Sequence, residues 1–263
     1  MFRRNAMFVT CFLFASVVWA QSIMENPAVW AAHVLAGGGW VSEVTVENTN
    51  LFSCRVRVQA LYGMSWSLPI AIQGKQGNSW EGELGPKEAI TLTLSRNGDM
   101  VAGYLQVDGG SYIAPFTGIR GIAVRTNTLT GEKFTDFLSR PAEKLEYKVE
   151  YGPDVDVVDT GIAIMNPPQY PTNTSGVVRF TLLDEEGRII AEEVRTRYFA
   201  GAQDAFFLSA LFAGNPDWQV LVARLYAHGL VFRGSIVIAH GQGIVGTSVI
   251  YDGSIIRATK PAS

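Results

Sequence analysis

The stretch Trp40-Val-Ser-Glu-Val-Thr-Val-Glu-Asn48 indicates an internal repeat, because a weaker echo of it, Thr160-Gly-Ile-Ala-Ile-Met-Asn166, ends 118 residues later. Within the first stretch, Val44-Thr-Val-Glu47 alternates apolar and polar side chains, which is typical of an antiparallel strand with one face in a core. Each stretch ends at an Asn and leads through a polar loop into a second strand-like run, Cys54–Tyr62 or Gly176–Asp184. We interpret each pair of runs as the first hairpin of one copy of a repeated domain.

The composition supports an all-β chain. Of the 263 residues 48% are hydrophobic and 17% are charged, so the chain can bury a core and is not disordered. The 27 glycines are scattered among short apolar runs, and turn signals recur about every 8–12 residues, as in antiparallel β-sandwiches. Composition becomes charged around Pro141, where we place a boundary. The expected organisation is two tandem antiparallel β-sandwich domains, residues 27–140 and residues 141–260.

Several further elements follow from local patterns. Ala89–Leu94 alternates cleanly, and the turn residues Asn97-Gly-Asp99 predict a hairpin with Val101–Val107. Glu132–Phe137 is read as an edge strand, and Pro27–Leu35 fits either a helical turn or a first strand.

The second domain is expected to contain one short helix, Ala202–Phe212. Its apolar side chains recur at helical spacing, Asp204 suits the first turn, and Gly214 can end it. A tight turn at Asp184-Glu-Glu-Gly187 is expected to join Val177–Leu183 to a returning strand. Three closing strands are expected after the helix: Leu221–Tyr226, Phe232–His240 and Ile244–Tyr251.

The N-terminus has the layout of a secretory signal peptide. Arg3 and Arg4 precede the uncharged run Ala6–Val18, and Val18-Trp-Ala20 offers small residues at the cleavage positions. The run is short of the roughly 20 apolar residues that span a bilayer as a helix, although a retained anchor is the alternative. We predict cleavage after Ala20 and a secreted protein, extracellular or periplasmic, without a membrane span.

The charge balance argues against nucleic acid as a partner, and the cysteine content argues against disulfide bonds within the chain. Removing residues 1–20 leaves 19 basic and 24 acidic residues, a balance that disfavours a nucleic-acid surface. Cys11 leaves with the signal peptide, so Cys54 stands alone and cannot form an intramolecular disulfide.

The sequence carries no catalytic signature. The three histidines, His33, His228 and His240, form no metal-binding pair at short spacing, and the chain has no Gly-x-Ser-x-Gly motif. A Ser-His-Asp triad stays open because geometry, not sequence order, defines it. Gly37-Gly-Gly39 precedes a strand rather than a helix, which favours a turn over a phosphate-binding loop. We therefore expect a protein that is not an enzyme.

Two stretches are candidates for ligand binding. In Asp154-Val-Asp156-Val-Val-Asp159 alternating carboxylates could supply the hard oxygens that Ca²⁺ prefers, although the Gly and Glu of an EF-hand loop are missing. Asp154, Asp156 and Asp159 are thus a candidate Ca²⁺ site, with an ordinary acidic loop as the alternative. Trp40, Trp66 and Trp80 are either core anchors or a platform on which sugars stack.

The second half of the chain resembles a loose group of secreted bacterial proteins with repeated immunoglobulin-like (Ig-like) β-sandwich domains. Four segments carry the resemblance: Leu183-Asp-Glu-Glu-Gly-Arg-Ile-Ile190, Phe207–Phe212, Phe232-Arg-Gly-Ser-Ile-Val-Ile238 and Ile244-Val-Gly-Thr-Ser-Val-Ile250. It covers most of residues 155–256 and more weakly residues 36–126, where the helix motif is missing. The resemblance implies Ig-like domains and no catalytic residue, since the shared positions are turn and core positions.

These observations predict a secreted, non-catalytic binding module with a surface, adhesion or structural role. Its partner would be an extracellular protein or a polysaccharide. The alternative is a carbohydrate-binding accessory or hydrolase-associated domain that uses exposed tryptophans.

Overall fold

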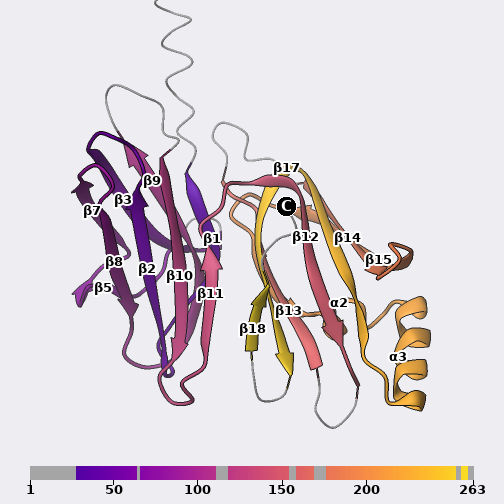
Figure 1. Cartoon of the computed structure of the whole chain (residues 1–263). Helices are drawn as coiled ribbons and strands as arrows, with labels where there is room; N and C mark the ends of the chain where they lie inside the picture. Colours follow the sequence, from indigo (N-terminus) through magenta and orange to yellow (C-terminus); the bar gives the residue numbers. More distant parts are fainter. Residues whose placement is uncertain are drawn as a thin grey trace, which may run out of the picture.

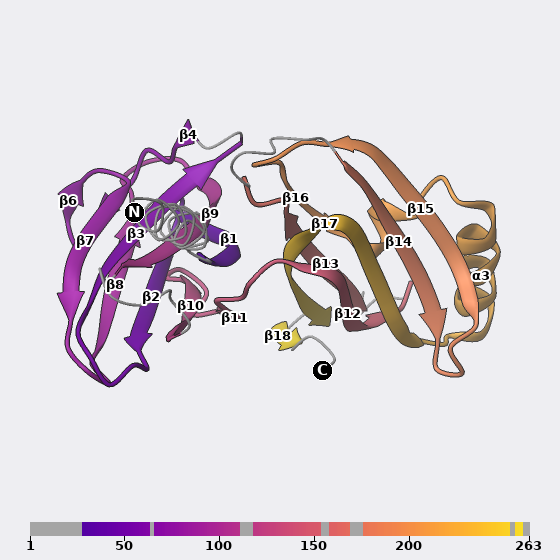
Figure 2. The same cartoon turned by 90° about the horizontal axis from the view of Figure 1, so that it is seen from above.

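The computed structural model describes residues 28–63, 66–110, 118–153, 158–168, 176–252 and 256–259. This part of the chain consists mostly of antiparallel strands, as the sequence predicts, together with two helices. Figure 1 and Figure 2 show the strands gathered into two halves that lie side by side. The N-terminal half ends with a strand at Phe137, and the C-terminal half begins with a strand at Ala142.

The N-terminal half contains two sheets. Sheet A has the order β1-β9-β3-β4, and β7 pairs with β3 at the same edge; sheet B has the order β11-β10-β2-β8-β5-β6. The strands of sheet A are β1 (Val29–Ala36), β3 (Cys54–Tyr62), β4 (Trp66–Ser67), β7 (Ser79–Leu84) and β9 (Val101–Gly110). The strands of sheet B are β2 (Trp40–Asn48), β5 (Ala71–Ile72), β6 (Lys75–Gln76), β8 (Ala89–Ser95), β10 (Ile119–Asn127) and β11 (Lys133–Phe137).

The C-terminal half repeats this plan. Sheet C has the order β15-β14-β17-β12, and sheet D has the order β16-β13-β17-β18. The strands are β12 (Ala142–Tyr151), β13 (Val158–Met165), β14 (Gly176–Asp184), β15 (Ile189–Tyr198), β16 (Gln203–Phe207), β17 (Phe232–Asp252) and β18 (Ile256–Thr259). The helices are α2 (Leu208–Leu211) and α3 (Pro216–His228).

Strand-by-strand pairing relates the two halves. The order β7-β3-β9-β1 in sheet A corresponds to β15-β14-β17-β12 in sheet C, and β8-β2-β10-β11 in sheet B corresponds to β16-β13-β17-β18 in sheet D. The halves differ in their insertions. The N-terminal half inserts β4, β5 and β6 between the third and fourth strands of the plan, and the C-terminal half inserts α2 and α3 after β16.

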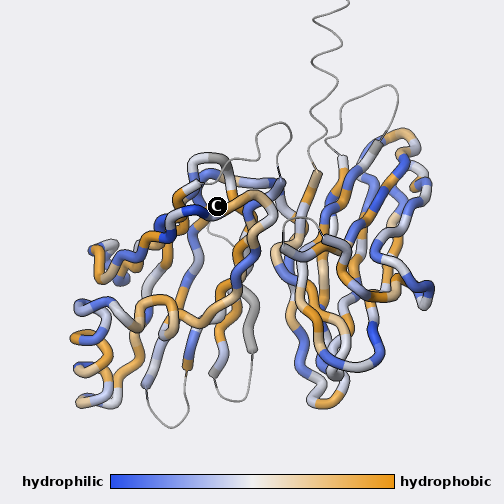
Figure 3. The backbone as a smooth tube through the Cα atoms, turned by 180° about the vertical axis from the view of Figure 1, so that it is seen from behind, coloured by the Kyte–Doolittle hydropathy of each residue, from blue (hydrophilic) through white to orange (hydrophobic). Residues whose placement is uncertain are grey.

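Period-two alternation puts apolar side chains between the sheets of each half. In β2 the buried Val44 and Val46 alternate with more exposed neighbours, and in β3 Val56 and Val58 do the same. Each half has its own hydrophobic core, built from residues 29–138 in one case and 147–244 in the other. Figure 3 shows the resulting change between hydrophobic and hydrophilic residues along the strands.

The predicted first hairpins are wrong, although the two stretches do correspond. β2 lies in sheet B and β3 in sheet A, and likewise β13 lies in sheet D and β14 in sheet C. The chain therefore crosses from one sheet to the facing sheet after Asn48 and again after Asn166. The hairpin expected between Ala89–Leu94 and Val101–Val107 fails in the same way, because β8 and β9 belong to different sheets.

Buried asparagines hold the two crossings. Nδ2 of Asn48 donates hydrogen bonds to the carbonyl oxygens of Phe52, Leu84 and Gly85 at 2.8, 3.1 and 2.9 Å. Nδ2 of Asn166 donates to the carbonyl oxygen of Tyr198 at 3.0 Å. An apolar side chain could not satisfy these buried carbonyls, which explains why each stretch ends at an Asn.

The helix expected over Ala202–Phe212 is largely a strand. Gln203–Phe207 forms β16, which pairs with β13, and only Leu208–Leu211 is helical. Pairing at the open edge of sheet D outweighs the helical spacing of the apolar residues. The expected strand Leu221–Tyr226 is wrong as well, because it lies within α3.

Helix α3 has clear end signals. Asn215 is its N-cap and accepts hydrogen bonds from the backbone N–H groups of Asp217 and Trp218, with Pro216 as the first helical residue. Gly229 ends it in the left-handed conformation with φ 59°. Trp218 and Leu225 are its buried side chains. These caps, rather than a continuous apolar stripe, mark the helix in the sequence.

The first strand, one edge strand and the turn between β14 and β15 agree with the sequence, and the last two expected strands are joined. Pro27–Leu35, left open between a strand and a helical turn, contains most of β1, and the edge strand read at Glu132–Phe137 is β11. Gly187 has φ 79°, and Oδ1 of Asp184 accepts hydrogen bonds from the N–H groups of Glu186 and Arg188, so the turn between β14 and β15 is confirmed. Phe232–His240 and Ile244–Tyr251 are one bent strand, β17, which passes from sheet C to sheet D.

Replacing Asn48 by Ala is expected to lower the free energy of unfolding by about 3 kcal/mol, because buried carbonyls lose their donor. Urea titration followed by circular dichroism measures this change. The control Asn97→Ala changes an exposed turn residue and should alter stability by less than about 0.5 kcal/mol. Equal effects of the two substitutions would contradict the structural role given to Asn48.

Candidate functional site

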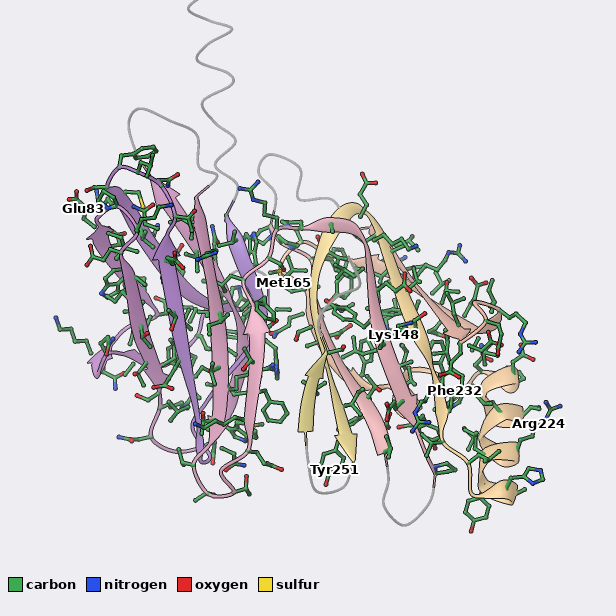
Figure 4. All side chains as sticks on the ribbon, in the orientation of Figure 1. Glu83, Lys148, Met165, Arg224, Phe232 and Tyr251 are labelled. Atoms are coloured by element: carbon green, nitrogen blue, oxygen red, sulfur yellow. The ribbon has the colours of Figure 1, made fainter. Side chains whose placement is uncertain are left out.

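The outer face of sheet D packs against β1 and β11, each of which is one edge strand of sheet A or sheet B. A small hydrophobic cluster joins the halves here, with Trp30, Leu61 and Tyr104 on one side and Met165 and Val245 on the other. Figure 4 shows Met165 at this junction. The halves therefore share buried apolar surface as well as the chain between them.

A polar contact fixes the same junction. Nε2 of Gln203, on β16, donates hydrogen bonds to the backbone carbonyl oxygens of Ala32 and Gly103 at 2.7 and 2.8 Å. One side chain of sheet D thereby binds β1 and β9 of sheet A. This double contact restricts sliding of one half along the other.

A cleft of about 280 Å³ lies between the halves next to this junction. Its walls are mostly apolar. The N-terminal half supplies Leu35, Trp40 and Phe134, with His33 and Arg125 among them, and sheet D supplies residues including Ile162, Ala163, Ala205, Phe206, Phe207 and Val249. The rings of Trp40 and Phe134 lie 5.4 Å apart, and Phe207 is half exposed. An apolar pocket with a few polar groups at a junction of this kind is a typical ligand site.

Arg125 is the charged group of the cleft. It lies on β10 on the same face as the buried Ala123, so strand alternation directs it inward, and only 4% of it is exposed. Its Nη1 is 2.6 Å from Nδ1 of His33, and its Cζ is 5.4 Å from the centre of the Phe134 ring. Its Nε and Nη2 have no partner among the residues that the structure describes.

His33 owes its position to a β-bulge. The pairing of β1 with β9 gains one extra residue between Ala31 and Val34, which turns the His33 side chain toward Arg125. Burial, followed by the positive charge of Arg125, lowers the pKa of His33 to about 3. The imidazole is therefore neutral at physiological pH, with Nδ1 available as the acceptor for Arg125.

Asp136 is the acidic member of the cluster. It lies on β11 opposite Ala123 and accepts hydrogen bonds from the Thr247 side chain and the backbone N–H of Phe137. Burial raises its pKa to about 6, while the charge of Arg125 acts in the opposite direction. Burial and the Asp136 charge raise the pKa of Tyr147, whose hydroxyl lies in the space that Gly246 leaves free.

This chemistry suits binding better than proton transfer. A histidine with a pKa near 3, hydrogen-bonded to a guanidinium, is a weak base at neutral pH. What the cleft offers is apolar surface and hydrogen-bond donors on a buried cation.

The structure places only one of the three calcium candidates. Asp159 is buried on β13 and accepts hydrogen bonds from the Ser209 hydroxyl and from the N–H groups of Thr160, Leu208 and Ser209, so it holds the start of α2. Asp154 and Asp156 lie outside the described residues. Within the described ranges no three His, Cys, Asp or Glu side chains gather as a metal site, and the calcium site stays a prediction.

The three tryptophans have different environments. Trp40 lines the cleft, Trp80 is partly buried against the N-terminal core, and Trp66 is 59% exposed. The Trp66 ring meets that of Tyr62 edge-on at 5.7 Å. The three tryptophans are therefore neither all core anchors nor members of one platform.

Sequence reasoning missed Arg125 and Asp136. A signal for Arg125 is present, since Gly121-Ile-Ala-Val-Arg125 places it two residues after a core alanine, at an inward position where a charge is unusual. No comparable signal links it to His33, which is 92 residues away.

Among the described residues, no helix is both long enough and apolar enough to cross a membrane. Comparisons of the chain with protein-family models, curated proteins and solved structures found no match.

His33→Gln is expected to change how stability depends on pH. In the unfolded chain a histidine has a pKa of about 6.5, so between pH 7 and pH 5 the unfolded state gains a proton that folded His33 does not. This costs the parent protein about 2 kcal/mol of unfolding free energy at pH 5. Stability is lost as the pH falls, because the folded pKa is the lower one.

Urea titrations at pH 7 and pH 5 measure the free energy of unfolding of the parent and of the variant. Asp136 and His240 contribute to the pH dependence of both proteins, so their contributions cancel in the difference. His228→Gln, at the exposed end of α3, is the matched control and should follow the parent. A difference between parent and His33→Gln that is the same at pH 7 and pH 5 would contradict the buried, neutral His33.

Proposed function

We propose that the chain is a secreted, non-catalytic binding protein made of two tandem Ig-like β-sandwich domains, residues 27–140 and 141–260, with its ligand site in the cleft between them. The signal-like segment before Gln21 supports secretion. The role is that of a surface, adhesion or structural module, and the natural partner is an extracellular protein or a polysaccharide that presents an apolar group to the cleft.

Strand pairing supports the Ig-like assignment in part. In each half the second strand of the plan pairs with the fifth, and the third pairs with the sixth, as B pairs with E and C with F in immunoglobulin domains. The first and seventh strands have exchanged sheets relative to that plan, since β1 pairs with β9 and β10 pairs with β2. The proposal is therefore a variant of the Ig arrangement.

One observation carries the binding function: the cleft is apolar but retains a buried cation. Packing alone would favour closing such a gap with larger side chains, yet sheet D lines it with Gly161, Ala163 and Ala205. A side chain at Gly161 would reach within 3.2 Å of Val249 and occupy part of the space. Small residues on one wall and aromatic residues on the other leave room for a guest.

Filling the cleft should abolish binding of an apolar probe. The fluorescent probe 8-anilinonaphthalene-1-sulfonate, excited in its own absorption band, is expected to bind the protein saturably with one site. Ala205→Trp should weaken this binding at least about tenfold, a loss of about 1.4 kcal/mol. Ala227→Trp, on exposed helix α3 at the far end of the C-terminal half, is the matched control (Figure 1). Equal binding by both variants, or no saturable binding by the parent, would contradict the cleft as the ligand site.

A second candidate function rests on the exposed Tyr62 and Trp66 pair. Exposed aromatic rings on a sheet edge can stack on sugars, as the carbohydrate-binding alternative requires.

If this pair binds sugars, the protein should be retained on an insoluble polysaccharide such as cellulose or chitin, and Trp66→Ala should lose that retention. Phe207→Ala, which changes a similarly exposed ring at the cleft, should keep it. Loss by Phe207→Ala instead would assign polysaccharide binding to the cleft.

A further inference from the structure

The two unpartnered donors of Arg125 lie on one edge of its guanidinium. Nε–H and the adjacent N–H of Nη2 point in nearly parallel directions, which is the geometry that binds two oxygens of one carboxylate or sulfonate. Both atoms are buried and lack a protein partner in the described part of the chain. Nη1, on the other edge, already contacts His33. The free edge is thus an unused pair of parallel hydrogen-bond donors on a side chain that lines the cleft.

The charge of Arg125 is only loosely compensated. The ion pairs closer than 4 Å among the described residues do not include Arg125. Asp136, whose negative charge acts on Arg125, accepts hydrogen bonds from Thr247 and Phe137, while its Oδ2 has no hydrogen-bond partner in the described part of the chain. His33 is a neutral acceptor. A buried cation in this setting gains more from an incoming anion than a cation that is already paired would.

The rest of the cleft favours an apolar body. Trp40 and Phe134 form one wall, and Phe207 and Val249 face it from sheet D. Arg125 is 4% exposed, whereas Phe207 is half exposed, so the charged group is the more deeply buried of the two. A guest that enters with its anion first can bury its apolar part between the rings.

We propose that the cleft binds a small organic monoanion with an apolar, ring-sized body, whose carboxylate or sulfonate is held by Nε and Nη2 of Arg125. This proposal rests on the proposed ligand site and adds the chemical class of the ligand. Because the two walls belong to different halves, the bound anion links the halves, and binding stabilises their present arrangement.

A charge series of one shape tests the proposal in the parent protein. The ligands are 1-naphthoate, the neutral 1-naphthalenemethanol and the cationic 1-naphthylmethylammonium, each titrated by isothermal calorimetry. Naphthoate is expected to bind at least about tenfold more tightly than the alcohol, since hydrogen bonds to charged groups are the stronger ones, and the cation should not bind detectably.

Two substitutions locate the effect. Arg125→Met keeps an apolar side chain of similar length and should remove the preference for naphthoate while the alcohol still binds. Arg55→Met, at an exposed position on β3, is the matched control and should keep the preference. Thermal melting confirms that each variant folds, and the ligand series in the parent needs no variant at all.

The cleft as a ligand site and its preference for an anion can fail separately. Equal affinity of the parent for naphthoate and the alcohol overturns the anion preference and leaves the cleft as a ligand site. Binding of neither ligand, together with no effect of Ala205→Trp on the fluorescent probe, overturns both. A preference for naphthoate that survives Arg125→Met in a folded protein overturns the assignment to Arg125.

Discussion

The contact of sheet D with the edge strands β1 and β11 holds the two halves of the chain together. It joins two sandwich-like halves through the apolar cluster around Trp30 and Met165 and through the double hydrogen bond of Gln203. Because sheet D covers the edge of the N-terminal half, Arg125 and Asp136 are buried rather than solvated. The same covering is incomplete next to them, and this leaves the cleft. Without this contact the chain would hold two cores and no cleft between them.

A buried cluster of Arg125, His33 and Asp136 is a poor way to stabilise an interface. Desolvation opposes the charge of both ionised groups, as the raised pKa of Asp136 and the lowered pKa of Arg125 show. Apolar residues of similar volume would often serve stability as well or better. Local departures from good packing and polar satisfaction are expected mainly at functional sites, which is the physical case for a ligand here.

The internal repeat explains where the halves are alike and where function can differ. Both copies share the crossing held by a buried Asn and the same order of strands in their facing sheets. The copies differ in their insertions, with β4–β6 in one and α2–α3 in the other, and in the faces that they present at the junction. The exposed Tyr62 and Trp66 pair belongs partly to the first insertion, and the cleft belongs to the junction.

Local structure could be predicted from the sequence: the all-β class, most strand positions, the turn at Asp184–Gly187 and the correspondence of Asn48 with Asn166. These features depend on period-two alternation and on residues that accept particular backbone conformations, and both are properties of short segments. The sequence also contained the end signals of α3, which the apolar pattern obscured. The pairing of the strands, the strand conformation of Gln203–Phe207 and the meeting of His33, Arg125 and Asp136 could not be predicted from it. A strand's edge can pair with any compatible edge, so the choice of partner, and with it the site, depends on contacts between residues far apart in the chain.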